Sequence, residues 1–194
     1  MEAKSLFTGE LITTFFKAKS TDLSREIRKI LTSDVPDETK EAKIEAITKF
    51  FTVKPLEFDF DKTTIKKADS NGDVIPNDAV ASRVMFFIPF RGDLDLLTIR
   101  PMQSSANSYS AQLSNDKAEL IFSLNVLESD GKRIRQHFNN FEKFVKEGVR
   151  AQRADIDTHN FSLKSIVSSD RQDILGKFHI QNNLLNDIGF PLRD

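Results

Sequence analysis

The stretch FFIPFRGDLDLLTIRP, residues 86–101, holds the sharpest change of pattern in the chain. An apolar run reaches Pro89, an Arg-Gly-Asp triplet follows, and leucines then alternate with acids up to an Arg-Pro pair. Proline cannot donate to a sheet ladder, so we expect the strand to end at Pro89. Gly92 permits a tight turn or a positive φ. The pattern predicts a corner in the fold, whose structural turn residues are Gly92, Asp93, Arg100 and Pro101.

A sheet is predicted on both sides of this corner. The run ASRVMFFIPF, residues 81–90, is apolar on both faces, which is typical of a central strand. An Asn-Gly pair at 71–72 predicts a hairpin turn before this strand. An Asn-Asp pair at 115–116 predicts a second hairpin after it. We therefore expect a mainly antiparallel sheet over residues 55–127.

Helices are predicted before the sheet, over residues 1–54. Ser20 or Thr21 is the expected N-cap of a helix whose leucines and isoleucines follow at helical spacing. Pro36 stands at the first position of the next helix, with acids in its first turn as the helix dipole prefers. An additional helix is predicted over residues 5–18.

A helical period returns after Gly131 and continues in two apolar stripes. The first stripe is Ile134, Phe138, Phe141, Val145 and Val149, and the second is Ile156, Asn160, Leu163, Val167 and Ile174. One helix through both stripes would exceed about forty residues, so we expect two helices with a break near 152–158. The order of elements predicts a single α+β domain over residues 1–194, closed by a helical pair over 131–188.

Composition excludes several classes of protein. The 194-residue chain has no cysteine, which rules out disulfides and thiol catalysis and favours a reducing, cytoplasmic location. It has neither an apolar run long enough to span a membrane nor an N-terminal signal peptide. Its 17 Phe, one Tyr and no Trp predict a core rich in phenylalanine. Three scattered histidines and the lack of a Gly-rich phosphate loop lead us to expect no cofactor.

A basic stripe marks the first of the two predicted C-terminal helices. Residues 132–153 contain seven Lys or Arg and two acids, which gives a local charge of +5. With Asn139 between Arg135 and Lys143, the residues of this stripe recur at steps of three or four, so they share one helix face. That face is either an ordinary solvated surface or a binding site whose unpaired cations contact phosphates or an acidic partner. The predicted binding residues are Lys132, Arg135, Lys143, Lys146, Arg150 and Arg153.

Other side chains allow competing hypotheses. Asp93, Asp95 and Glu119 could hold a metal ion in a nuclease or phosphodiesterase, because hard cations prefer oxygen ligands. A second set of carboxylates alternates along a predicted strand, where a solvated strand face is the simpler reading, and consists of Glu57, Asp59 and Asp61. The basic stripe would also suit a non-specific nucleic-acid binder, although no aromatic residue interleaves it.

The histidines offer only a weak catalytic signal. His159 has Ser162 and Ser165 near it in the sequence, and His137 lies beside the basic stripe. We expect both to be ordinary surface or hydrogen-bonded histidines rather than members of a catalytic dyad.

From Phe87 onward the chain resembles a widespread set of poorly characterised bacterial proteins. The shared pattern is a Phe-x-Gly-Asp-x-x-Leu-Leu block, a sheet hairpin, a long helical pair with an Asn-x-x-Leu step, and a closing Leu-Gly-hydrophobic-Pro-Leu motif. The matching residues are Phe90, Gly92, Asp93, Leu96, Leu97, Arg100, Pro101, Asn160, Leu163, Arg171, Gly189, Pro191 and Leu192. Ile188 stands where leucine is commoner, and the resemblance covers roughly the last 110 residues.

This resemblance implies a setting rather than a reaction. Members of the set often continue past the Pro-Leu motif into a TIR-like or restriction-endonuclease-like effector, which implies prokaryotic conflict systems such as antiphage defence. The resemblance brings no catalytic residues. We expect a module of a longer protein or a stand-alone partner. The leading hypothesis is a non-enzymatic, cytoplasmic regulatory module that binds a protein partner or an acidic ligand through the basic stripe, with its oligomeric state open.

Overall fold

The computed structural model describes residues 3–69, 81–102, 108–114, 116, 118–127 and 131–188. The described residues form three α-helices and an antiparallel sheet, so the predicted α+β class is confirmed. The chain divides into two compact units, one of residues 1–15 and 53–156 and the other of residues 16–52 and 157–194. Each unit has its own core and is described separately below.

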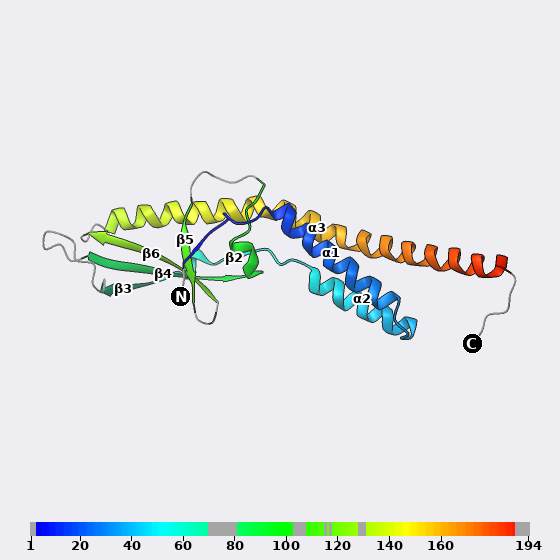
Figure 1. The fold of residues 1–194 in the computed structure, drawn as a ribbon. Coiled ribbons are helices and arrows are strands. Elements are labelled where there is room, and N and C mark those ends of the chain that lie inside the picture. The colour runs from blue at the N-terminus through cyan, green and yellow to red at the C-terminus, as the bar shows by residue number, and fades with distance from the viewer. Residues whose placement is uncertain are drawn as a thin grey trace. The chain divides into compact units, whose positions relative to one another are not determined.

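The first unit contains the sheet (Figure 1). Its strands within the described residues are β1 (Lys4–Ser5), β2 (Glu57–Phe58), β3 (Thr64–Asp69), β4 (Ala81–Arg91), β5 (Ser110–Leu113) and β6 (Glu119–Leu127). The order is β1-β5-β6-β4-β2, with β3 also paired to β4, and every one of these pairs is antiparallel. The predicted central position of β4 is confirmed. The predicted turn at 71–72 lies outside the described residues.

The N-terminal residues join this sheet, so the helix expected over 5–18 is wrong in its first half. Lys4 and Ser5 pair with Ala111 and Ser110. The chain then turns, and Gly9 donates its N–H to the carbonyl of Thr98 at 2.7 Å. A Cβ at Gly9 would lie 2.8 Å from that same oxygen, so this close approach favours glycine.

Strand β4 continues through Pro89 to Arg91, so the expectation that the strand ends at this proline is wrong. The missing N–H of Pro89 instead affects the edge of the sheet that lies beside β4. The carbonyl of Pro89 accepts a hydrogen bond from the Asp59 N–H at 2.9 Å, but Pro89 has no donor to return. The five residues 59–63 therefore lie opposite only two residues of β4, and the edge loops outward through the 3-10 turn η1 (Phe60–Lys62).

The predicted corner follows β4. Gly92 has a φ of 116°, and a Cβ there would collide with the carbonyl of Pro55. Asp93 makes two bonds with Lys54: its N–H donates to the Lys54 carbonyl and its Oδ2 accepts from the Lys54 N–H, both at 3.0 Å. The 3-10 turn η2 (Leu94–Leu97) then buries two leucines. Arg100 holds the N-terminal segment, because its carbonyl accepts from the Ile12 N–H at 2.9 Å.

Helix α3 (Gly131–Ile188) covers one face of the sheet with its N-terminal part (Figure 1). Phe138 stacks on Phe86 of β4 with ring centroids 4.5 Å apart, and Phe141 stacks on Phe122 of β6 at 4.0 Å. Full burial of one such ring contributes about 1.5–3 kcal/mol. Gly148 lies against the ring of Phe7, where a Cβ would meet the ring carbons. Phenylalanine thus fills this core, as its abundance predicts.

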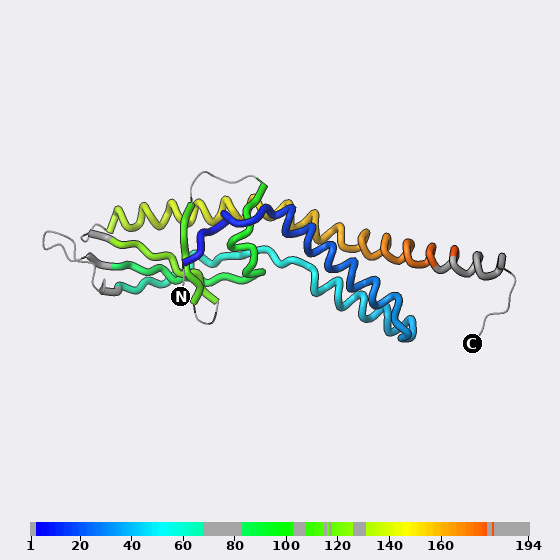
Figure 2. Tube along the Cα trace, viewed as in Figure 1, coloured from blue at the N-terminus to red at the C-terminus, as the bar shows by residue number. Residues whose placement is uncertain are grey.

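The second unit is helical. Helices α1 (Ile12–Leu31) and α2 (Asp37–Phe51) run antiparallel beside the C-terminal part of α3 (Figure 2). Its core combines buried and partly buried apolar residues from all three helices, namely Leu23, Ile27, Leu31, Ile47, Phe51, Leu163, Ile166 and Val167. Pro36 occupies the N-cap of α2. Arg28 and Arg171 tie the helices together through ion pairs with Asp170 and Glu41.

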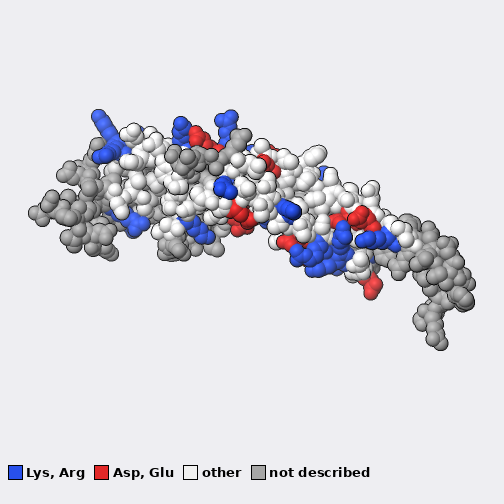
Figure 3. Space-filling model, turned by 45° about the horizontal axis from the view of Figure 1, so that its top comes forward, with Lys and Arg blue, Asp and Glu red and all other residues white. Residues whose placement is uncertain are grey.

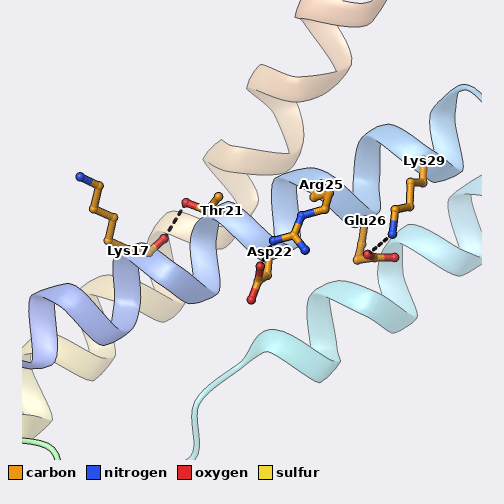
Figure 4. Close-up of polar contacts among 6 residues, drawn as sticks. All are labelled: Lys17, Thr21, Asp22, Arg25, Glu26 and Lys29. Carbon is orange, nitrogen blue, oxygen red and sulfur yellow. Dashed lines mark hydrogen bonds and ion pairs between the residues drawn. The ribbon is translucent and has the colours of Figure 1, made fainter. Parts of the chain in front are cut away.

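Helix α1 begins at Ile12, so the predicted N-cap at Ser20 or Thr21 is wrong. Thr21 lies inside the helix and satisfies its hydroxyl by donating to the Lys17 carbonyl at 2.9 Å (Figure 4). The same exposed face carries two short-range ion pairs, Asp22 with Arg25 and Glu26 with Lys29 (Figure 4). A threonine followed by an acid resembles a helix start in the sequence, but the helix continues through this point from Ile12 to Leu31.

The predicted break near 152–158 is also wrong, because α3 is one helix of 58 residues. The buried residues of α3 follow one continuous stripe along the helix. For example, the buried residues at 141, 152, 163 and 174 lie 11 residues, or about three turns, apart. Three buried members of this stripe are polar: Gln152, His159 and Asp170. Because these residues look like surface residues, the single stripe reads as two in the sequence.

Candidate binding surface on α3

The six cations predicted to bind a partner lie on the part of α3 that belongs to the first unit. All six side chains are exposed. We call this set the basic face; it consists of Lys132, Arg135, Lys143, Lys146, Arg150 and Arg153. Phe141, Val145 and Gln152 are buried on the opposite side of the same helix segment. The segregation of charged and apolar residues expected from the spacing is therefore present.

Gln152 fixes the position of the basic face, and the sequence pattern does not identify it. Its Nε2 donates to the carbonyls of Leu96 and Ile99, at 2.9 and 2.7 Å. These carbonyls belong to the turn after the corner, where regular sheet bonds end. The side chain is only 1% exposed. A buried amide that satisfies two carbonyls holds the helix in one register, and the 11-residue phase of the stripe is the signal that could have found it.

Two cations of the basic face are paired with acids on the same helix, so the expectation of unpaired lysines is wrong for them. Lys143 lies 3.9 Å from Glu147, and Lys146 contacts Glu142. Exposed pairs at this spacing contribute only about 0.3–0.5 kcal/mol, so an incoming carboxylate can replace either glutamate at small cost. In Figure 3 the Lys and Arg side chains on the visible face form separate groups with acids between them, not an unbroken band.

An open hollow of about 330 Å³ lies along this part of the helix. Its lining combines both ion pairs with Asn139 and Arg150. Arg150 makes no ion pair with any residue in the described parts of the chain. Because a single helix lines the hollow, it is a groove between side chains and not a pocket that encloses a small molecule.

A second, larger hollow adjoins the basic face, and we call it the aromatic hollow. Its volume is about 530 Å³ and its lining consists of Glu57, Phe58, Asp59, Phe60, Asp61, Pro89, Phe90, Arg91 and Lys146. Phe58 stacks on Phe60 and on Phe90, with centroids 5.7 and 5.3 Å apart. Lys146 belongs to both hollows, and its Nζ lies 5.3 Å from the centre of the Phe60 ring. The outward loop opposite Pro89 brings these groups together.

Two of the three carboxylates that line the aromatic hollow already have cationic partners. Glu57 pairs with Arg91, and Asp59 pairs with Lys62 at 2.7 Å. The hydrogen bond and charge of Lys62 hold the pKa of Asp59 below its usual value. The predicted alternation of Glu57, Asp59 and Asp61 on one strand face is wrong, because η1 interrupts the strand after Phe58.

The alternative metal site is not assembled. Within the described residues, no three or more His, Cys, Asp or Glu come together in a group that could hold a metal ion. Asp93 uses its carboxylate to accept from the Lys54 N–H, Asp95 is exposed in η2, and Glu119 lies opposite Pro89 in the sheet. Asp93 therefore contributes to the corner rather than to a cluster of ligands.

His159 and Ser162 do not form a catalytic dyad. The Ser162 hydroxyl donates to the backbone carbonyl of His159 at 2.7 Å and not to its ring. His159 is buried, stacks on Phe16, and leaves its Nε2 without a hydrogen-bond partner. Burial lowers the pKa of His159, partly offset by a hydrogen bond with the Phe51 backbone. Desolvation disfavours a charged ring here, which suits a packing role.

The fold and this surface define an α+β protein with an exposed cationic helix beside an aromatic hollow. No protein-family model matches the chain, and neither a curated protein nor a solved structure matches it. None of the helices in the described parts of the chain has the length and apolar character that crossing a bilayer requires.

Proposed function

We propose that the protein is a non-catalytic interaction module that binds an acidic segment of a protein partner through the basic face of α3. The observation that carries the proposal is the exposure of six cations on a helix segment whose opposite side is held by stacked phenylalanines and by Gln152. Rigid presentation reduces the ordering cost of binding, because the helix need not form when the partner arrives.

A protein partner fits the surface better than nucleic acid does. Glu142 and Glu147 lie between the cations of the basic face, and Asp61 borders the adjoining hollow. These carboxylates would repel a continuous row of phosphates, whereas a peptide can position its acids to meet individual cations.

The cellular role follows from the resemblance alone and is the broader part of the proposal. The module would act in the cytoplasm of a prokaryote and would couple recognition of its partner to an effector, as in antiphage defence. The closing motif of that resemblance, at Gly189, Pro191 and Leu192, lies outside the described residues. Phe90, Gly92 and Asp93 of the first motif lie at the end of β4 and in the corner after it.

The binding proposal is tested with a short fluorescein-labelled peptide of glutamate and serine, whose anisotropy reports complex formation. The variant Lys143→Glu, Lys146→Glu, Arg150→Glu should bind it at least about tenfold more weakly than the unaltered chain. The matched control reverses three exposed lysines in the second unit, Lys43→Glu, Lys164→Glu and Lys177→Glu, and should leave the affinity unchanged. Equal weakening in both variants would show that only net charge matters, and would contradict a site on α3.

A further inference from the structure

The aromatic hollow is open to solvent although phenylalanines form its floor. Phe58, Phe60 and Phe90 are each only partly buried. Phe58 and Phe60 come from the sheet edge itself, from β2 and η1, where the edge loops away from β4 opposite Pro89. An apolar floor that the fold itself leaves uncovered is suited to take an apolar group from outside.

The hollow and the basic face meet at one residue. Lys146 lines both hollows, and its Nζ lies over the Phe60 ring at 5.3 Å while it also contacts Glu142. Lys143 and Arg150 stand about one turn before and after it on the helix. A ligand whose carboxylates contact these cations must therefore have neighbouring groups within reach of the phenylalanine floor.

The charges around the hollow restrict what can enter it. Glu57 and Asp59 are already neutralised by Arg91 and Lys62, so the rim offers little net attraction to a cation. Lys146 already occupies one face of the Phe60 ring. An uncharged apolar side chain meets no charge repulsion in this hollow, whereas a phosphate would face the carboxylate of Asp61.

We infer that the partner segment carries a bulky apolar residue, such as phenylalanine or leucine, next to its acids, and that this residue enters the aromatic hollow while the acids bind Lys143, Lys146 and Arg150. The inference rests on the proposed function and names the chemistry of the partner. Specificity then comes from the hollow, because a charged helix face alone accepts any acidic segment.

Two peptides that differ at one position test the inference. Both are short, labelled segments of glutamate and serine; one has a central phenylalanine and the other an alanine. The phenylalanine peptide should bind the unaltered chain about tenfold more tightly, as expected for partial burial of one ring. Its binding should perturb the amide NMR signals of residues 59–62, which the alanine peptide should leave unchanged.

Blocking the hollow separates the two proposals. Asp61→Trp places a bulky side chain at the exposed rim without altering the buried core, and should reduce the affinity for the phenylalanine peptide to that of the alanine peptide. Glu45→Trp, on the exposed side of α2, is the matched control and should retain the tenfold preference.

The outcomes separate the failure of the hollow from the failure of the proposed function. Equal affinity of the two peptides for the unaltered chain, with both affinities reduced by the triple charge reversal, overturns the hollow and keeps the basic face. No binding of either peptide overturns the proposed function and the inference together. Tighter binding of a labelled oligothymidine than of both peptides would replace the peptide partner with single-stranded nucleic acid, which also overturns the inference.

Discussion

The imidazole of His159 stacks face to face on the ring of Phe16, with ring centroids 4.4 Å apart and 4° between the planes. The side chain is 5% exposed, and its Nε2 has no hydrogen-bond partner. Lys19 adds a nearby positive charge, while the backbone of Phe51 accepts a hydrogen bond from the ring. Burial and the nearby Lys19 charge both lower the pKa of this histidine, mainly through burial.

This arrangement predicts a loss of stability on mild acidification. The folded-state pKa of His159 lies below its ordinary value of about 6.5, mainly because burial disfavours the charged form. The unfolded chain therefore binds the proton first, and the free energy of unfolding falls as the pH drops below about 6.5. Thermal melts between pH 7.5 and pH 5.5 should show this decrease, and His159→Gln should flatten it. His137→Gln, at an exposed position, should keep it; an unchanged slope in His159→Gln contradicts this account.

The hydrogen bonds of Gln152 should contribute strongly to the stability of the first unit. Gln152→Ala removes both donors and leaves two carbonyls in the turn without partners. The expected loss of unfolding free energy is about 2–4 kcal/mol, measured by urea denaturation. Gln172→Ala, on the exposed side of the same helix, should change it by less than about 0.5 kcal/mol. Similar effects for both variants would show that Gln152 does not hold α3.

Two glycine substitutions should act in opposite directions. Gly92→Ala forces a Cβ into the carbonyl of Pro55 at a φ of 116°, and should destabilise the chain by about 1–3 kcal/mol or more. Gly176→Ala meets no atom within 4 Å on α3 and should stabilise the chain by about 0.5–1 kcal/mol, because alanine favours helix. Urea denaturation measures both. A neutral Gly92→Ala would show that the corner does not need a left-handed residue.

Much of this fold follows from local patterns in the sequence. The alternation and apolar runs between residues 55 and 127 predict an antiparallel sheet with β4 at its centre, and the acids after Pro36 predict the start of α2. Both signals are local, because each depends on neighbours along one strand or one helical turn. The exposure of the six cations on α3 follows from spacing in the same way.

Features that depend on tertiary contacts could not be read from the sequence. Pro89 does not end its strand. Its nitrogen, which carries no hydrogen, faces only the edge of the sheet, and that edge loops outward at this point. The polar residues Gln152, His159 and Asp170 hide the single buried stripe of α3. The aromatic hollow combines residues from β2, η1, β4 and α3, which are distant in sequence.

The pairing of Lys143 and Lys146 with nearby glutamates, in contrast, was predictable from the four-residue spacing.

The salt dependence of binding tests the central claim most directly. The dissociation constant of the full chain for the phenylalanine-containing acidic peptide is measured from about 50 mM to about 200 mM sodium chloride, alongside the variant Lys143→Glu, Lys146→Glu, Arg150→Glu. If the basic face is the binding site, the unaltered chain loses roughly tenfold in affinity over this range, and the variant binds weakly with little further loss. Salt-independent binding, or an equally steep loss in the variant, would contradict the account.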